Sequence, residues 1–166
     1  QCVAANRIKG EARLAPDIRF VIHMDDDVLL PPHFMSQLLS VLVSQDNVGA
    51  VSAVMTGARG EVQNDINPTR IPVGTVQASD HLAGTCFAYD REKTPIVWDA
   101  EYQGSQWEDT DAMMQIKAQG YRTVATGNVQ IIHRNNLNKA AKFWNENKAH
   151  FISKWPGALR TGDLKP

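Results

Sequence analysis

Hydrophobic residues recur along the chain with helical and strand periods, and these periods divide its first third into four elements. Residues 4–15 predict a helix interrupted at Gly10. A run rich in β-branched residues over 18–24 predicts a buried strand of a parallel sheet. Pro31-Pro32 then starts a helix that reaches about Ser44, and 48–55 predicts a second strand. Strand, helix and strand together form a βαβ unit with a right-handed crossover.

The same alternation continues after an irregular stretch over 56–80. So long a stretch inside a compact domain is usually functional or mobile. Within it, we expect 61–63 and 73–77 to pair as a short hairpin. Beyond it, the pattern predicts strands over 81–91, 121–125 and 129–133, and helices over 105–118 and 137–155. Ser105 and Glu108 form a capping-box pattern, which predicts where the first of these helices begins.

Composition and charge fit one soluble globular domain spanning residues 1–166. The chain is 43% hydrophobic and 21% charged, and its net charge of -1 provides no basic field for nucleic acid. No apolar run approaches the ~20 residues that a membrane span requires. Cys2 and Cys86 follow no disulfide or metal pattern, which fits a reducing compartment. We therefore expect an α/β protein of the cytoplasm, with peripheral membrane association left open.

Three consecutive carboxylates, Asp25, Asp26 and Asp27, end the first predicted strand. In open α/β sheets, ligands bind at the carboxyl ends of the strands. Three neighbouring negative charges repel one another, and a cation removes that penalty. Carboxylates that meet a phosphate-bearing substrate form a usual Mg²⁺ or Mn²⁺ site. The alternative is a solvated acidic loop with no ligand.

Two other segments carry candidate chemistry. His133 ends the last predicted strand on the same edge of the sheet as the aspartates, which favours a functional histidine over a structural one. Glu108, Asp109 and Asp111 open a predicted helix, where acidic residues also simply complement the helix dipole. Gly84 lies in a predicted strand, where it serves either close approach to a ligand or tight packing.

In their order along the chain, these motifs resemble those of the GT-A glycosyltransferases, most closely the inverting family 2. The resemblance implies a truncated GT-A (Rossmann-like) α/β fold, with a mixed, mainly parallel sheet flanked by helices. Met24-Asp25-Asp26-Asp27 resembles the DXD metal motif, and Gly84-Thr85 through Arg91 resembles the strand beside the donor sugar. Glu108-Asp109 with the helix that ends in Gly120-Tyr121-Arg122 resembles the family's ED motif. DXD alone is a weak signal, whereas the acidic helix at this distance after it is considerably stronger.

The resemblance implies roles for these residues in transfer of a sugar from a nucleotide-diphosphate donor to a carbohydrate or lipid-linked acceptor. Asp25, Asp27 and His133 would bind Mn²⁺ or Mg²⁺, which neutralises the leaving diphosphate. Asp25, Asp26, Gly84 and Thr85 would contact the donor, and Asp109 would be the general base. Trp107 and Glu108 would face the acceptor, although burial of Trp107 under the sheet is about equally expected.

The resemblance also implies that most of the family's N-terminal nucleotide-binding half is missing before Ile22. The acidic strand would then have an open flank, which is a liability for a sheet. We therefore expect self-association, or a partner chain that completes this edge. Two other functions remain open: a haloacid-dehalogenase-type phosphatase with Asp25 as its nucleophile, because 20–28 also fit that signature, and a transferase-derived domain used only for binding or assembly.

Overall fold

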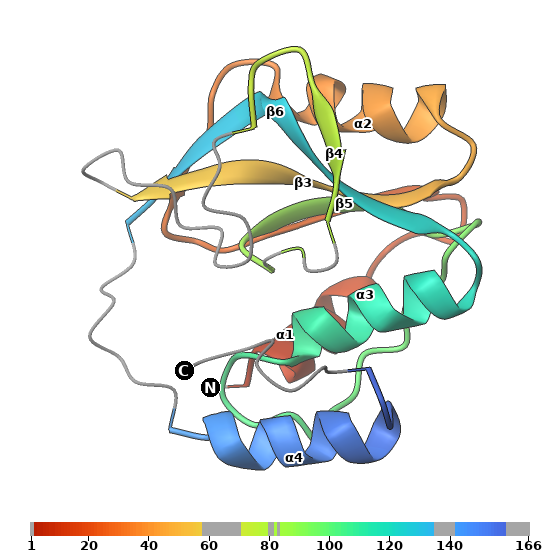
Figure 1. The fold of residues 1–166 in the computed structure, drawn as a ribbon, viewed down its shortest axis with the longest axis vertical. Helices are drawn as coiled ribbons and strands as arrows, with labels where there is room; N and C mark the ends of the chain where they lie inside the picture. Colours follow the sequence, from red (N-terminus) through yellow and green to blue (C-terminus); the bar gives the residue numbers. More distant parts are fainter. Residues whose placement is uncertain (1, 58–70, 80–81, 83, 135–141, 159–166) are drawn as a thin grey trace.

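The computed structural model describes residues 2–57, 71–79, 82, 84–134 and 142–158. Within these residues a mixed sheet has helices on both faces, and Figure 1 shows α2 on one face and α1 and α3 on the other, with α4 beyond α3. The elements are α1 (Val3–Glu11), β1 (Phe20–Met24), β2 (Val28–Leu29), α2 (Phe34–Ser44), β3 (Val48–Gly57), β4 (Val76–Ala78), β5 (Cys86–Asp90), α3 (Glu108–Ala118), β6 (Arg122–His133) and α4 (Trp144–Lys154). The expected α/β class with a mixed sheet and flanking helices is confirmed.

Three of the strands in the sheet, β1, β3 and β6, run in the same direction. The strand order is β1-β5-β3-β6-β2, with β4 also paired to β6. β3 and β6 are parallel, while β5 is antiparallel to both β1 and β3. It follows that β1, β3 and β6 all run the same way, and that their carboxyl ends lie at one edge of the sheet.

The first strand differs from its prediction. We expected 18–24 to be a buried strand with parallel neighbours, but β1 is half-buried, lies at the end of the strand order and pairs antiparallel with β5. The reason is that β5, from later in the chain, is inserted between β1 and β3. The sheet is therefore less parallel than expected, since β3 and β6 form the one parallel pair among the described strands.

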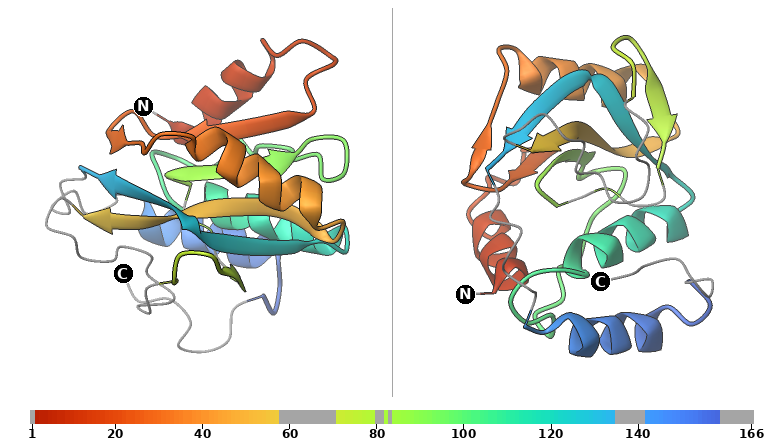
Figure 2. Two further views of the ribbon diagram at one scale, coloured as in Figure 1. Left: turned by 90° about the horizontal axis from the view of Figure 1, so that it is seen from above. Right: turned by 60° about the vertical axis from the view of Figure 1, so that its left-hand side comes forward.

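Residues 122–133 form one strand, where two were predicted. The pairing of β6 with β3 jumps from Ala53↔Thr126 to Val54↔Gln130, so that 127–129 are extra residues of β6. Such a bulge bends a strand and increases its twist. As a result, the first half of β6 pairs with β4 and its end pairs with β2 (Figure 2).

Several predicted element ends were wrong. α1 continues through Gly10, and α2 begins at Phe34, after His33, and not at the prolines. α3 begins after Trp107, which has φ 74° and makes no side-chain capping bond, so the capping box of Ser105 and Glu108 does not form. Of the predicted hairpin, 61–63 lie outside the described residues, and β4 pairs with β6 instead.

Two hydrophobic clusters cover the two faces of the sheet. β5 alternates between them: Cys86 and Ala88 face α2, whereas Phe87 and Tyr89 face α3. This period of two is the packing of a sheet between helices. A third, aromatic cluster lies between the start of α3 and α4, and contains Ala4, Tyr102, Trp107 and Phe151. In the described residues no helix is long and apolar enough to cross a membrane, and Cys2 and Cys86 are free thiols.

Candidate metal and donor-binding site

Asp25, Asp26 and Asp27 connect β1 to β2, which lie at opposite ends of the strand order. β2 pairs with the end of β6, so that Val28 lies opposite His133, and the amide of Arg134 donates a hydrogen bond to the carbonyl of Asp27 (3.0 Å). The backbone pairing of β2 therefore fixes the acidic residues beside His133.

The side chains of Asp25, Asp27 and His133 converge. Nε2 of His133 lies 3.1 Å from Oδ1 of Asp27 and 4.0 Å from Oδ2 of Asp25, and one potential ligand atom from each residue lies within 4.8 Å of the other two. His133 is buried, Asp25 half-buried and Asp27 exposed. Two carboxylates and an imidazole arranged in this way can bind one divalent cation.

Burial is the main influence on Asp25. It raises the pKa of the Asp25 carboxyl, and the neighbouring Asp27 charge acts in the same direction. The nearby Arg7 and His133, together with a hydrogen bond from Thr85, lower the pKa and oppose this effect. A carboxylate that is partly desolvated beside a second acid is stabilised in its charged form by a bound cation.

Gly84 and Thr85 join this site to the start of α3. The amide of Asp25 donates to the carbonyl of Thr85 (2.9 Å), and the amide of Gly84 donates to Oδ2 of Asp109 (2.8 Å). A Cβ atom at Gly84 would lie 2.4 Å from Nη2 of Arg7 and 3.1 Å from Cβ of Asp109. A side chain at this position would therefore displace the Arg7 guanidinium and press on Asp109.

The side chains of Arg7 and Glu108 lie close together in the interior, next to Gly84. Nη2 of Arg7 donates to the carbonyl of Gly84 (3.1 Å), and Nη1 lies 3.6 Å from Oε1 of Glu108. Burial, reinforced by the charge of Asp109, raises the pKa of Glu108 to about 8, although Arg7 opposes the shift. The sequence did not point to Arg7, because nothing in the pattern of α1 distinguishes it from a surface cation.

A groove of about 690 Å³ lies between α1 and β1 and reaches the metal-ligand candidates. Arg7, Glu11, His23, Asp25 and His133 are among the residues that line it. Oε1 of Glu11 accepts hydrogen bonds from His23, Tyr89 and Trp98, at 2.8, 2.8 and 2.6 Å, which fixes this wall of the groove. In the described part of the chain, Asp109 is outside this lining and meets the groove only through Gly84 and Arg7.

Asp26 and Trp107 are the remaining predicted site residues. Asp26 is exposed and lies outside the Asp25, Asp27 and His133 cluster. Trp107 is 3% exposed and packs edge-on against Trp144, with ring centroids 5.2 Å apart, and against Phe151 at 5.1 Å. Trp107 is thus buried, as the alternative for it expected, but against α4 and not under the sheet, and in this arrangement its ring has no free face for a sugar.

The class of fold follows from these elements: it is GT-A-like, a mixed α/β sheet with an acidic turn and a histidine at one edge. The fold is similar to that of GalNAc-T7 in a crystal structure with UDP, GalNAc and Mn²⁺, with a TM-score of 0.62 and 15% identity over 99% of this chain and 39% of that chain. It is also similar to A197 from STIV, with a TM-score of 0.51 and 12% identity over 81% of this chain and 68% of that chain.

These similarities concern the fold alone, because the sequence identities are low. No protein-family model matches the chain, and no curated protein matches it. The chain spans about 39% of the length of the GalNAc-T7 chain.

Proposed function

We propose that this chain belongs to a metal-dependent glycosyltransferase that transfers a sugar from a nucleotide-diphosphate donor to an acceptor hydroxyl. The observation that carries the proposal is the convergence of Asp25, Asp27 and His133 at the edge of the groove. The similarity of the fold to an enzyme crystallised with UDP and Mn²⁺ supports it. Family 2 membership and inversion of configuration rest on the ED-type motif at Glu108-Asp109 and are part of this proposal.

The donor atoms of the three residues fit Mn²⁺ or Mg²⁺. Carboxylate oxygens suit both ions, and the imidazole nitrogen favours Mn²⁺, because Mg²⁺ prefers oxygen ligands. When bound, the cation would neutralise the charge that develops on the leaving diphosphate. Asp26, Gly84 and Thr85 are the proposed donor contacts beside it.

Asp109 is the proposed general base for the acceptor hydroxyl. Its Oδ2 accepts from the amide of Gly84 (2.8 Å) and its Oδ1 from the amide of Thr110 (2.8 Å), so the carboxylate has a fixed orientation. A general base must be held within hydrogen-bonding reach of the proton that it removes. Glu108 is the proposed acceptor contact next to it, while Trp107 would contact the acceptor only if its aromatic neighbours moved apart.

Calorimetry with UDP and Mn²⁺, followed by an assay for hydrolysis of sugar nucleotides, tests this function. We expect UDP to bind only when Mn²⁺ is present, and Asp27→Asn to abolish that binding. Absence of binding and of hydrolysis would contradict the proposal and leave a binding or assembly domain. Release of phosphate from p-nitrophenyl phosphate with Mg²⁺, abolished by Asp25→Asn, would instead indicate the phosphatase.

The proposed partner is a second copy of this chain, or another chain, along the open edge of β1. β1 ends the strand order, and such an edge offers unpaired backbone groups. Light scattering over a wide concentration range tests this, because a chain that pairs along β1 forms dimers as its concentration rises. A monomer at every concentration would contradict self-association.

A further inference from the structure

The segment 103–107, which leads into Glu108 and Asp109, has an unusual backbone. Gly104 has φ 65°, Gln106 φ 84° and Trp107 φ 74°. Two consecutive residues with side chains in the left-handed region are strained and persist only when the surrounding contacts hold them there. Because α3 begins at the next residue, the conformation of this segment sets the direction in which the first turn of α3 presents Asp109.

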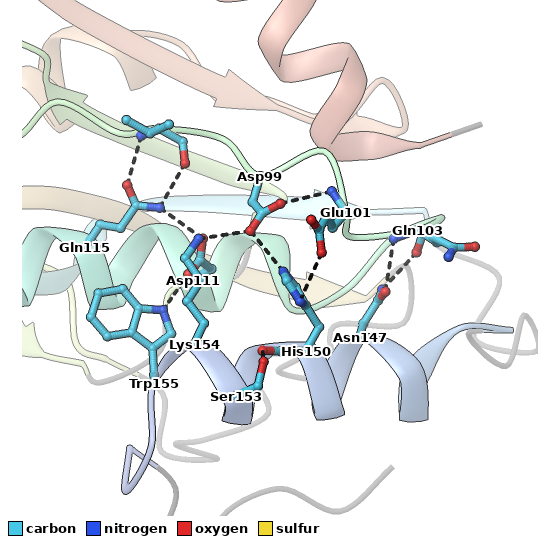
Figure 3. A network of polar contacts seen from close by, with 11 residues as sticks. Asp99, Glu101, Gln103, Asp111, Gln115, Asn147, His150, Ser153, Lys154 and Trp155 are labelled. Atoms are coloured by element: carbon cyan, nitrogen blue, oxygen red, sulfur yellow. Dashed lines mark hydrogen bonds and ion pairs between the residues drawn. The ribbon is translucent and has the colours of Figure 1, made fainter.

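One side chain of α4 makes most of the polar contacts to this segment. Asn147 is 2% exposed, and its Oδ1 accepts a hydrogen bond from the amide of Gln103 (3.0 Å). Its Nδ2 donates to the carbonyls of Gln103 (2.8 Å), Gln106 (3.1 Å) and, more weakly, Ser105 (3.4 Å). Figure 3 shows Asn147 pointing from α4 toward Gln103. Because three carbonyl oxygens lie around one end of the Asn147 amide group, that end must be the NH2 group, which donates.

α4 is in turn anchored to α3, so that Asn147 has a fixed position relative to Asp109. Nζ of Lys154 lies 2.8 Å from Oδ2 of the buried Asp111 and 3.1 Å from Oδ2 of Asp99. The indole of Trp155 donates to the other oxygen of Asp111 (Figure 3). The strained segment is thus held between two helices that are themselves bound to each other.

We infer that Asn147 is a positioning residue for the reaction: it holds 103–107 in the strained conformation that directs Asp109 toward Gly84. This inference rests on the proposed role of Asp109 as general base. Asn147 acts through the backbone and does not itself touch the substrate. It deepens the proposed function because it gives α4 a role in positioning the general base, although α4 carries none of the proposed metal ligands.

Three variants test the inference. Asn147→Ala removes all the hydrogen bonds of the side chain. Asn147→Asp has nearly the same shape and keeps the acceptor for the amide of Gln103, but it directs a carboxylate toward three carbonyls. Asn145→Ala is the matched control, because Asn145 is exposed on the same helix. The first two variants are expected to free the segment, and the third is not.

Hydrogen–deuterium exchange gives a measurement that does not depend on activity. In both Asn147 variants we expect amides of 103–110 to exchange at least about tenfold faster than in the wild type and in Asn145→Ala. The affinity for Mn²⁺ alone should be unchanged in all of them, because Asp25, Asp27 and His133 lie on other elements. If Asn147→Ala does not fold, Asn147→Ser, which keeps a smaller donor and acceptor, takes its place in the comparison.

Kinetics then separates positioning from a purely structural role. In a full transfer reaction, Asn147→Asp should lower kcat at least about tenfold and leave the KM for the donor unchanged. Unchanged exchange over 103–110, or an unchanged kcat in Asn147→Asp beside an active wild type, would overturn the inference. An inactive wild type that binds no donor would overturn the proposed function itself, which is a different result from either of these.

Discussion

Nε2 of His133 lies 3.1 Å from Oδ1 of Asp27, although His133 ends β6 and Asp27 precedes β2, so that most of the chain separates them. The contact arises because β2, which follows Asp27 directly, pairs with the last residues of β6. The relative position of acid and imidazole is therefore set by backbone hydrogen bonds of the sheet. A site held in this way is preorganised for its ligand, which lowers the cost of binding.

Removal of the Asp27 carboxylate or of the His133 imidazole should weaken metal binding. We expect Asp27→Asn and His133→Ala each to reduce the affinity for Mn²⁺ at least about tenfold, because metal sites depend strongly on each ligand and on its orientation. Calorimetry with Mn²⁺ alone measures this. Asp26→Asn is the matched control, since Asp26 is the neighbouring acid outside the cluster. Equal losses in Asp26→Asn and Asp27→Asn would indicate a diffuse acidic surface in place of a site.

Asp109→Asn should separate catalysis from binding. The amide oxygen of asparagine can still accept from the amide of Gly84, so the local structure should persist. Loss of a general base typically lowers a rate by about 10²–10⁴. We therefore expect kcat for transfer to fall in this range while the affinity for Mn²⁺ is retained. A variant that transfers sugar as fast as the wild type would exclude Asp109 as the base.

The edge of the sheet at which the candidate site lies could be predicted from the sequence, for a physical reason. The apolar runs over 18–24 and 129–133 belong to β1 and to the end of β6, which run the same way as predicted, and polar residues at the ends of such runs lie at one edge of the sheet. The distance between Asp27 and His133 could not be predicted, because it depends on β2, a strand of two residues without a pattern of its own.

The position of β1 and the role of Arg7 could not be derived from local patterns. The apolar residues of β1 would suit a central strand as well as an edge strand, and only the insertion of β5 decides between them. Arg7 is buried because Gly84, Glu108 and Trp98 surround it, and these come from segments far along the chain. The strained backbone at Gln106 and Trp107 is likewise a tertiary property, since neither residue type favours a positive φ.

Gly84→Ala tests the close packing between α1 and α3. The added methyl group would overlap with the guanidinium of Arg7 and press on Asp109, so we expect a loss of roughly 1–3 kcal/mol in the free energy of unfolding. Gly10→Ala is the control, because a Cβ there meets nothing within 4 Å and Gly10 lies in α1. Replacing a helical glycine by alanine typically stabilises by about 0.5–1 kcal/mol. Urea unfolding of both variants should therefore give shifts of opposite sign.

Glu108 should make stability depend on pH. Its folded-state pKa is raised to about 8 by burial, whereas the ordinary value is 4.5. Between these values the folded protein binds a proton that the unfolded chain has released, so the free energy of unfolding should fall as pH rises from about 4.5 to about 8 and then level off. Each pKa unit corresponds to about 1.4 kcal/mol, which is large enough to measure.

Glu108→Gln should remove this slope. Urea unfolding at several values between pH 5 and pH 8 should give the glutamine variant a growing advantage over the wild type as pH rises, because glutamine has no charge to bury. Glu146→Gln is the control, since Glu146 is exposed on α4 and its replacement should leave the slope intact. Parallel pH profiles for the wild type and Glu108→Gln would mean that the pairing with Arg7 keeps Glu108 ionised throughout this range, with the carboxylate charge balanced inside the protein.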